Sequence, residues 1–332
     1  MSRTIPADET ALPFNPLRRS LYSAGELFAG YDPGDAESYA ACPDTRILAY
    51  FAKYGTNPVG STGASTLEAL HDNSISLAMQ PLLRASTRVV AIMGGHRLLR
   101  GTAAYAATAR LARGLGRAGI LLASGGGPGA MEATHLGALF ALASERDLEG
   151  ALAALAAEPH LPPRAQDLVN TLGEIDGAVA RALHRWFAPA HRIAMDFAGG
   201  GGGTSLGVPT WLYGHEPTTP LATHIAKYFQ NSVREDGLVT IAVSGIVYAE
   251  GSAGTVQEIF QDASQNYYGG AFYPMVFLSA PGARYWTDTL PVRPLIEALL
   301  GKKPDFARRV LFTDDPGAAL AFLAGGEPAA TA

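Results

Sequence analysis

Two glycine-bearing turns hold the residue types best suited to chemistry in this chain. The Gly125 turn, residues 124–129, reads S-G-G-G-P-G, and the Gly251 turn, residues 250–254, reads E-G-S-A-G. Each turn follows an apolar run and enters a helical pattern. A glycine turn at a helix start leaves backbone N–H groups unpaired at the positive end of the helix dipole, and such groups bind phosphate. The pattern predicts an anion site, and small residues chosen for tight packing are the alternative interpretation.

The helix after the Gly251 turn is expected to begin near Thr255. Glu258 then lies about one turn into that helix, where its carboxylate can face the same cavity as the phosphate site. A third glycine pair, Gly94-Gly95, follows the apolar run 88–93. All three turns are expected at the carboxyl ends of strands, where open parallel sheets bind their ligands.

Apolar runs and helical spacings alternate from residue 88 onward, which predicts a doubly wound, Rossmann-like parallel α/β sheet with helices on both faces. Strands are expected at residues 88–93, 119–123, 206–212, 245–248, 271–278 and 309–313. Helices are expected at residues 102–117, 130–143, 221–234, 255–261, 286–300 and 314–323. Residues 234–244 suit either a helix or a strand by their periodicity.

The remaining segments predict the domain organisation. Residues 1–85 form a helical N-terminal extension, with helical spacings at 17–28, 46–54 and 65–83. Residues 86–325 form the nucleotide-binding domain, and 144–190 are a helical insertion within it. The glycine run 199–203 is interpreted as a mobile loop, with a backbone anion nest as the alternative. Residues 326–332 are expected to be a disordered tail.

Composition excludes several classes of protein. Of the 332 residues 48% are hydrophobic and 17% charged, which excludes a disordered chain. The net charge of −5 argues against nucleic-acid binding. A single cysteine, Cys42, excludes an internal disulfide and a cysteine-based zinc cluster, and it fits a reducing cytoplasm. Neither a secretory signal nor a run of membrane-spanning length is present, so a cytoplasmic protein without a membrane partner is expected.

Two common nucleotide motifs are absent. Residues 125–129 lack the spacing of the dinucleotide fingerprint, and no acidic residue ends a following strand where the ribose would lie. No Gly-Lys-Ser or Gly-Lys-Thr sequence of a phosphate-binding P-loop occurs. A mononucleotide therefore fits the chain better than a dinucleotide.

The combination of Gly94-Gly95, G-G-G-P-G-A-M-E-A at 125–133 and G-S-A-G-T-V-Q-E at 251–258 resembles the LONELY GUY family. The resemblance covers about residues 87–325. It implies a Rossmann-like fold, a homodimer or higher homo-oligomer, and hydrolysis of the N-glycosidic bond of a nucleoside 5′-monophosphate such as AMP. Free base and ribose 5-phosphate are the products. Neither a metal nor a redox cofactor is implied.

Site residues follow from the resemblance by position. The family's catalytic glutamate falls on Glu258, and its catalytic arginine falls on Arg234 with about one residue of insertion, which implies that 234–244 is helical. The implied substrate-binding residues are Gly94, Gly95, Gly125, Gly126, Gly127, Gly129, Glu132, Gly251, Ser252, Ala253, Gly254 and Thr255. Among them, Glu132 is assigned either to the ribose hydroxyls or to the dipole of its own helix.

One departure from the family pattern bears on activity. Glu250-Gly251-Ser252 stands where Pro-Gly-Gly is usual, which adds an anion near the expected phosphate. A non-catalytic nucleotide or cofactor carrier or sensor on the same fold is therefore the alternative function. A lysine decarboxylase is excluded because pyridoxal chemistry needs a Schiff-base lysine. The candidate lysines, Lys53, Lys227, Lys302 and Lys303, do not adjoin a glycine turn.

Overall fold

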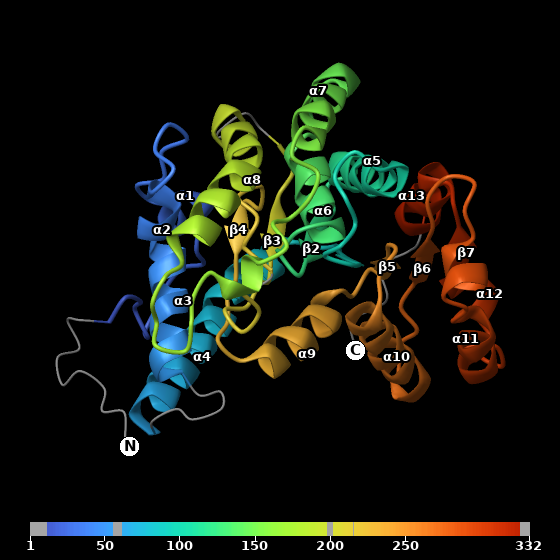
Figure 1. The fold of residues 1–332 in the computed structure, drawn as a ribbon. Coiled ribbons are helices and arrows are strands. Elements are labelled where there is room, and N and C mark those ends of the chain that lie inside the picture. Colours follow the sequence, from blue (N-terminus) through green and yellow to red (C-terminus); the bar gives the residue numbers. More distant parts are fainter. Residues whose placement is uncertain (1–11, 56–61, 198–201, 215, 326–332) are drawn as a thin grey trace.

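A parallel sheet of seven strands in the order β4-β3-β2-β1-β5-β6-β7 forms the centre of the protein (Figure 1). The computed structural model describes residues 12–55, 62–197, 202–214 and 216–325. The strands are β1 Val89–Met93, β2 Leu121–Ser124, β3 Ser205–Gly207, β4 His224–Ile225, β5 Ile246–Tyr248, β6 Met275–Leu278 and β7 Val310–Thr313. All of their pairings are parallel, and the predicted doubly wound α/β class is confirmed.

Both faces of the sheet are covered, which is why β1 is apolar at every position. Successive side chains of a strand point to opposite faces. Val90 and Ile92 pack in one core with α5 (Ala103–Arg117), α6 (Ala130–Leu139) and α13 (Pro316–Ala324). Val89, Ala91 and Met93 pack in a second core on the opposite face.

The N-terminal segment belongs to that second core. Its helices are α1 Ala24–Leu27, α2 Ser38–Ala41, α3 Pro43–Tyr54 and α4 Thr62–Ala85, and they share the face with α9 (Asn231–Ile241), α10 (Ala253–Tyr268) and α11 (Arg293–Leu300). Phe14 packs on Phe229 with ring centroids 4.7 Å apart, and Tyr22 packs edge-on against Trp211 at 6.0 Å. Aromatic contacts of this kind join residues before position 85 to the sheet domain.

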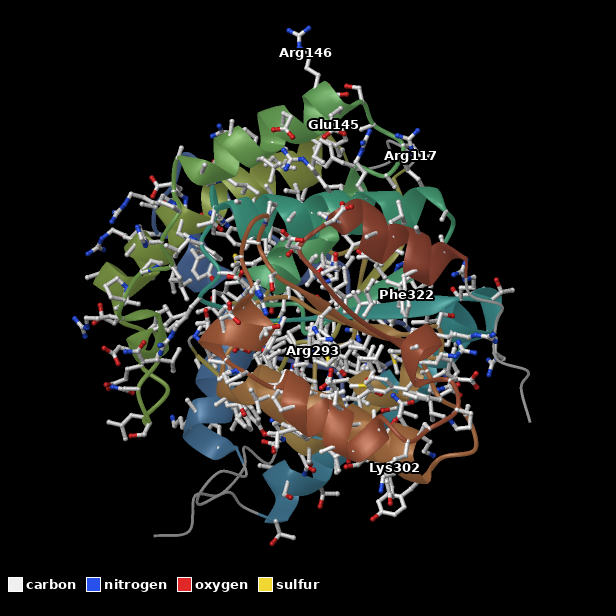
Figure 2. All side chains as sticks on the ribbon, turned by 90° about the vertical axis from the view of Figure 1, so that its right-hand side faces the viewer. Arg117, Glu145, Arg146, Arg293, Lys302 and Phe322 are labelled. Atoms are coloured by element: carbon white, nitrogen blue, oxygen red, sulfur yellow. The ribbon has the colours of Figure 1, made fainter. Side chains whose placement is uncertain are left out.

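The predicted insertion is largely two helices, α7 (Glu145–Ala156) and α8 (Gly177–Asp196), joined by irregular backbone with a 3-10 turn at Ala165–Asp167. A capping box at Ser144 and Asp147 starts α7. Both helices pack on α5 and α6 in a third apolar cluster. In Figure 2, Arg146 of α7 and Lys302, which follows α11, lie at opposite ends of the molecule.

The helix predicted at 221–234 is wrong over most of its length. Residues 224–225 form the edge strand β4, Tyr22 exchanges both backbone hydrogen bonds with Ile225 at 2.9 Å, and the helix begins only at Asn231. The carboxylate of Asp72 accepts the N–H groups of Phe229 at 3.0 Å and Gln230 at 2.9 Å. Partners distant in sequence supply these bonds, so local periodicity does not reveal them.

Three other element predictions are corrected in extent. Only Ala24–Leu27 of the helix predicted at 17–28 is helical, because Tyr22 is paired with the sheet. The strand predicted at 206–212 stops at Gly207, two residues before Pro209, which cannot donate to a ladder. The helix predicted at 286–300 divides into a π-helical turn, Tyr285–Thr289, and α11, with Pro291 between them.

Some predictions fall wholly or partly on undescribed residues. The disordered tail at 326–332 lies outside the described part of the chain, as does most of the glycine run 199–203. In the described part, no helix is both long enough and apolar enough to span a membrane.

Candidate functional site

The three glycine turns meet at the carboxyl edge of the sheet. Gly95 lies between the other two turns: its N–H donates to the Glu250 carbonyl at 2.9 Å, and its carbonyl accepts the Ala130 N–H at 3.2 Å. The chain adds β2, β3 and β4 on one side of β1 and then β5 on the other, so this is the point where the strand order reverses. Doubly wound sheets bind their ligands at that point.

The Gly251 turn leaves the start of α10 open. Ser252, Ala253 and Gly254 are exposed, and the Ser252 side chain does not cap the helix. The amide N–H groups of the first turn of a helix have no acceptors within the helix. A Cβ on Gly251 would lie 2.9 Å from the Gly95 nitrogen and 2.2 Å from Thr255 Oγ1, so only glycine fits there. This geometry is suited to an anion.

Glu250 and Ser252, the two residues that make the Gly251 turn differ from Pro-Gly-Gly, are both accommodated. Oε1 of Glu250 accepts the Ala280 N–H at 2.8 Å, which holds the carboxylate toward the end of β6. Ser252 has φ −128°, outside the left-handed region that favours glycine, so a serine fits without backbone strain.

Glu258 is a partly buried carboxylate on α10. No hydrogen bond or ion pair joins it to another described residue. Burial raises its pKa from 4.5 to about 7, the Arg234 charge opposes that rise, and the charges of Glu235 and Glu216 add to it. A carboxylate with a pKa near neutrality and no protein partner is typical of catalytic positions.

Arg234 lies opposite Glu258, on α9. Its guanidinium is buried, Nε donates to Asn231 Oδ1 at 2.9 Å, and a Cβ on Gly125 would lie 3.0 Å from Nη1. The helical prediction for this segment is confirmed as far as Ile241. Asn231 is a positioning residue that the sequence interpretation missed, although its place one turn before Arg234 on the same helix face was a usable signal.

Side-chain pairs hold α9 and α10 together. Gln257 Nε2 donates to Glu235 Oε2 at 3.0 Å, and Gln261 Nε2 donates to Asp236 Oδ1 at 2.7 Å. The two helices lie next to each other in Figure 1. These contacts fix the positions of Arg234 and Glu258 relative to one another.

The Gly125 turn is buried, unlike the Gly251 turn. The Gly126 carbonyl accepts the Thr219 N–H at 2.9 Å, and the Gly126 N–H donates to Ser124 Oγ at 3.2 Å. The first amide of α6 is already bonded to Gly95. The N–H and carbonyl of Gly126 and the N–H of Ala130 are therefore bonded to protein. The Arg234 guanidinium lies against Gly125, at the start of the turn.

Glu132 is fully buried and bound by protein. Arg100 donates from Nε to Oε2 at 2.7 Å and from Nη2 to Oε1 at 2.6 Å, and the Tyr105 hydroxyl donates to Oε2 at 2.9 Å. Both carboxylate oxygens are thus engaged by protein, which leaves neither for ribose hydroxyls, and Glu132 lies in the first turn of α6, as the helix-dipole assignment expects. Arg100 also donates to the Trp186 carbonyl at 2.8 Å, which ties α6 to α8.

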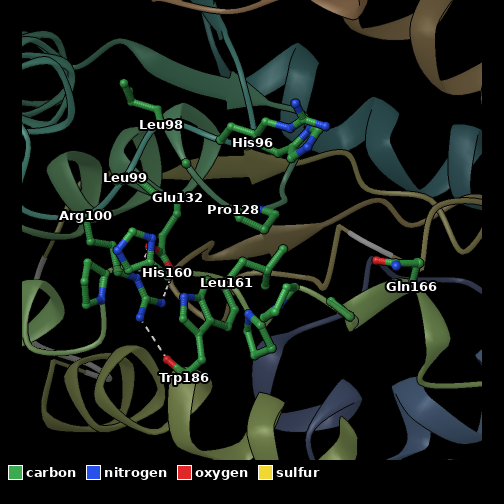
Figure 3. Close-up of a pocket in the computed structure, with 16 residues that line it drawn as sticks. His96, Leu98, Leu99, Arg100, Pro128, Glu132, His160, Leu161, Gln166 and Trp186 are labelled. Carbon is green, nitrogen blue, oxygen red and sulfur yellow. Dashed lines mark hydrogen bonds and ion pairs between the residues drawn. The ribbon is translucent and has the colours of Figure 1, made fainter.

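A cavity of about 610 Å³ adjoins the turns (Figure 3). Its walls come from the Gly94 turn, the start of α6 and the insertion, and its lining includes His96, Pro128, His160, Gln166 and Trp186. The volume lies within the range of small-molecule sites. The sequence interpretation did not anticipate this cavity, because residues 157–176 were taken only as part of a helical insertion.

His96 and Glu216 were also missed as a pair. His96 Nδ1 lies 3.1 Å from Glu216 Oε1. His96 directly follows the Gly94-Gly95 pair, which was a signal in the sequence, whereas Glu216 comes from the β3–β4 connection and only the fold brings it here.

Two further ionisable side chains, His71 and Lys227, are bound by other side chains of the protein. His71 bonds the Tyr22 hydroxyl at 2.8 Å and Asp72 at 3.0 Å, and Lys227 donates to Asp44 at 2.7 Å. Among the described residues, no three metal-ligating side chains gather in a group that could hold a metal ion.

Comparisons with known proteins add little beyond the fold. No protein-family model matches the chain, and no curated protein sequence matches it. Among solved structures, the chain is similar to a molybdenum cofactor binding protein from the phototrophic bacterium Rippkaea orientalis. The likeness has a TM-score of 0.40 and 11% identity, and it covers 72% of this chain and 96% of that one.

Proposed function

We propose that the chain hydrolyses the N-glycosidic bond of a nucleoside 5′-monophosphate, releasing free base and ribose 5-phosphate. The observation that carries the proposal is the carboxylate of Glu258, which no other described residue binds, on the same helix whose open N-terminus is suited to phosphate. The resemblance of the turns to the LONELY GUY family supports the same assignment. Hydrolysis requires no change of oxidation state and therefore no redox cofactor.

Each group has a role in this reaction. Breaking the bond at C1′ develops positive charge on the ribose ring, which a fixed carboxylate stabilises. The ionised form of Glu258 can also orient the attacking water. Amide groups at the start of α10, including that of Thr255, bind the 5′-phosphate. Arg234, held by Asn231, can bind phosphate or ribose oxygens by charge-assisted hydrogen bonds.

The test is release of free base from AMP, GMP, CMP, UMP and IMP. We expect hydrolysis of at least one monophosphate and much weaker hydrolysis of its nucleoside, because each lost charge-assisted contact costs about 1.5–3 kcal/mol. Glu258→Gln should lower kcat by roughly 10³-fold while nucleotide affinity changes little, because it removes stabilisation felt mainly in the transition state.

Glu297→Gln, an exposed change on α11, serves as the matched control and should retain full activity. Equal hydrolysis of AMP and adenosine would contradict the phosphate assignment. Tight nucleotide binding without base release would instead favour the carrier or sensor, the alternative function on this fold.

A further inference from the structure

The His96–Glu216 pair lies near Glu258, at the carboxyl edge of the sheet. Glu216 is near enough for its charge to act on Glu258. Its Cβ also lies close to the Gly125 turn, because a Cβ on Gly127 would be 3.5 Å from it. Arg234 covers the start of that same turn. The pair is therefore at the border of the proposed ribose site, on the side where the turn continues toward Pro128.

One member of the pair, His96, reaches the 610 Å³ cavity. His96 and Pro128 both line the cavity, and Figure 3 shows His96 at the end away from Trp186. Because Nδ1 of the ring is turned to Glu216, Nε2 points to the other side of the ring. The side chains of His96 and Glu216 are 26% and 18% exposed, so a ligand can reach them.

The hydrolysis proposed above needs a group in this position. When the bond to C1′ breaks, its electron pair goes to the base, and an unprotonated purine would leave as an anion. A general acid that protonates a ring nitrogen lowers that barrier, and histidine is the side chain most often used. The acid has to lie on the side of C1′ that faces away from the phosphate, because the base is bound there.

We propose that His96 is the catalytic acid for the departing base, that Glu216 is its positioning residue, and that the cavity receives the base. This inference rests on the proposed function. A proton passes from His96 to a ring nitrogen as the bond to C1′ breaks. Water adds to C1′ and gives its proton to Glu258. His96 regains a proton from solvent and Glu258 loses one, which completes hydrolysis.

The test uses two leaving groups. Adenine needs a proton to leave AMP as a neutral base. The nicotinamide ring of nicotinamide mononucleotide is cationic while it is bound to ribose, so it leaves as a neutral base without a proton. His96→Gln should lower AMP hydrolysis by about 10²–10⁴-fold and change nicotinamide mononucleotide hydrolysis by less than about threefold. Glu216→Gln should show the same selectivity with a smaller loss. Glu258→Gln should lower hydrolysis of both substrates.

The outcomes separate the two proposals. If wild type cleaves the monophosphates but both histidine variants, His96→Gln and His96→Asn, lose the two activities equally, His96 only supports the structure and the inference is overturned. Unchanged AMP hydrolysis in both variants overturns it as well. If wild type cleaves none of AMP, GMP, CMP, UMP, IMP and nicotinamide mononucleotide, the proposed function fails, and this inference fails with it; where another purine monophosphate is cleaved best, it replaces AMP in the comparison.

Discussion

The Gly125 and Gly251 turns share a sequence signal and have opposite surroundings. Both follow a strand of the sheet and enter a helix, and both contact Gly95. The Gly125 turn is buried, with the N–H and carbonyl of Gly126 bonded to protein, whereas the Gly251 turn is exposed at the start of α10. A glycine turn therefore specifies a tight strand-to-helix connection, and only its surroundings decide whether an anion can reach the amides.

The glutamates that follow the turns differ in the same way. Glu132 has both carboxylate oxygens bound by Arg100, and Glu258 has no protein partner among the described residues. One carboxylate stabilises the structure, and the other remains available to a ligand. The predictions below test this division, from the largest expected effect to the smallest.

Glu132→Gln should be strongly destabilising. It leaves the buried Arg100 without its counter-charge, and breaking a buried pair costs about 3–5 kcal/mol. Denaturant unfolding measures the loss. As the control, Glu149→Gln breaks the exposed pair with Arg110 and should cost less than about 1 kcal/mol. Equal, small losses would mean that Glu132 is not a structural residue.

Gly129→Ala should destabilise the protein by about 2–4 kcal/mol, since positive φ and overpacking each cost a few kcal/mol. Gly129 has φ +70°, and a Cβ there would lie 2.3 Å from the Gly95 carbonyl oxygen. Gly254→Ala meets no atom within 4 Å and should leave stability unchanged or slightly higher. Thermal unfolding of the two variants compares the turns directly, and similar melting temperatures would contradict the difference.

Glu258→Gln should stabilise the protein at about pH 8 by about 1–3 kcal/mol. The pKa raised from 4.5 to about 7 means that ionising this carboxyl lowers the free energy of unfolding, and glutamine does not ionise. The folded state holds the proton more tightly than the unfolded state. The contribution of Glu258 to the free energy of unfolding of the wild type therefore falls as pH rises from about 4.5 to about 7. Above that range the whole destabilisation is present. Near pH 4 the two proteins should unfold alike.

The same ionisation sets the activity profile. On the acid side of the pH profile, the ratio kcat/KM of the wild type should rise with a midpoint near 7, as Glu258 loses its proton. A profile that is flat from about pH 5 to 9 would remove Glu258 from the mechanism.

Glu250→Gln should have the smallest effect. The carboxylate faces the Ala280 N–H, away from the open amides of α10, and a glutamine oxygen can keep that hydrogen bond. Phosphate affinity and base release should change by less than about twofold, since the carboxylate is held at Ala280 and salt screens what remains of its charge at the amides. A tenfold gain in phosphate affinity would show that Glu250 faces the anion site.

The sequence predicted the central strands of the sheet better than the surroundings of the turns, and by periodicity it left the helix that carries Arg234 undecided between helix and strand. Continuous apolar runs such as β1 are strong local signals. The burial of the Gly125 turn, the Arg100–Glu132 pair and the His96–Glu216 pair depend on segments distant in the chain, which no local period encodes. Edge strand β4 was missed for the same reason, because β3 on one side and Tyr22 on the other supply its pairing.

The carboxylate of Asp72 has a consequence for how far this protein can be shortened. Asp72 binds the backbone just before α9, the helix that presents Arg234 and, through Gln257 and Gln261, contacts α10. A chain cut at residue 85 would lose this anchor together with the aromatic partners of Trp211 and Phe229. The smallest unit that keeps Arg234 and Glu258 in place should therefore include the N-terminal helices, whose removal would loosen α9 even if the sheet still assembled, and would weaken the proposed activity.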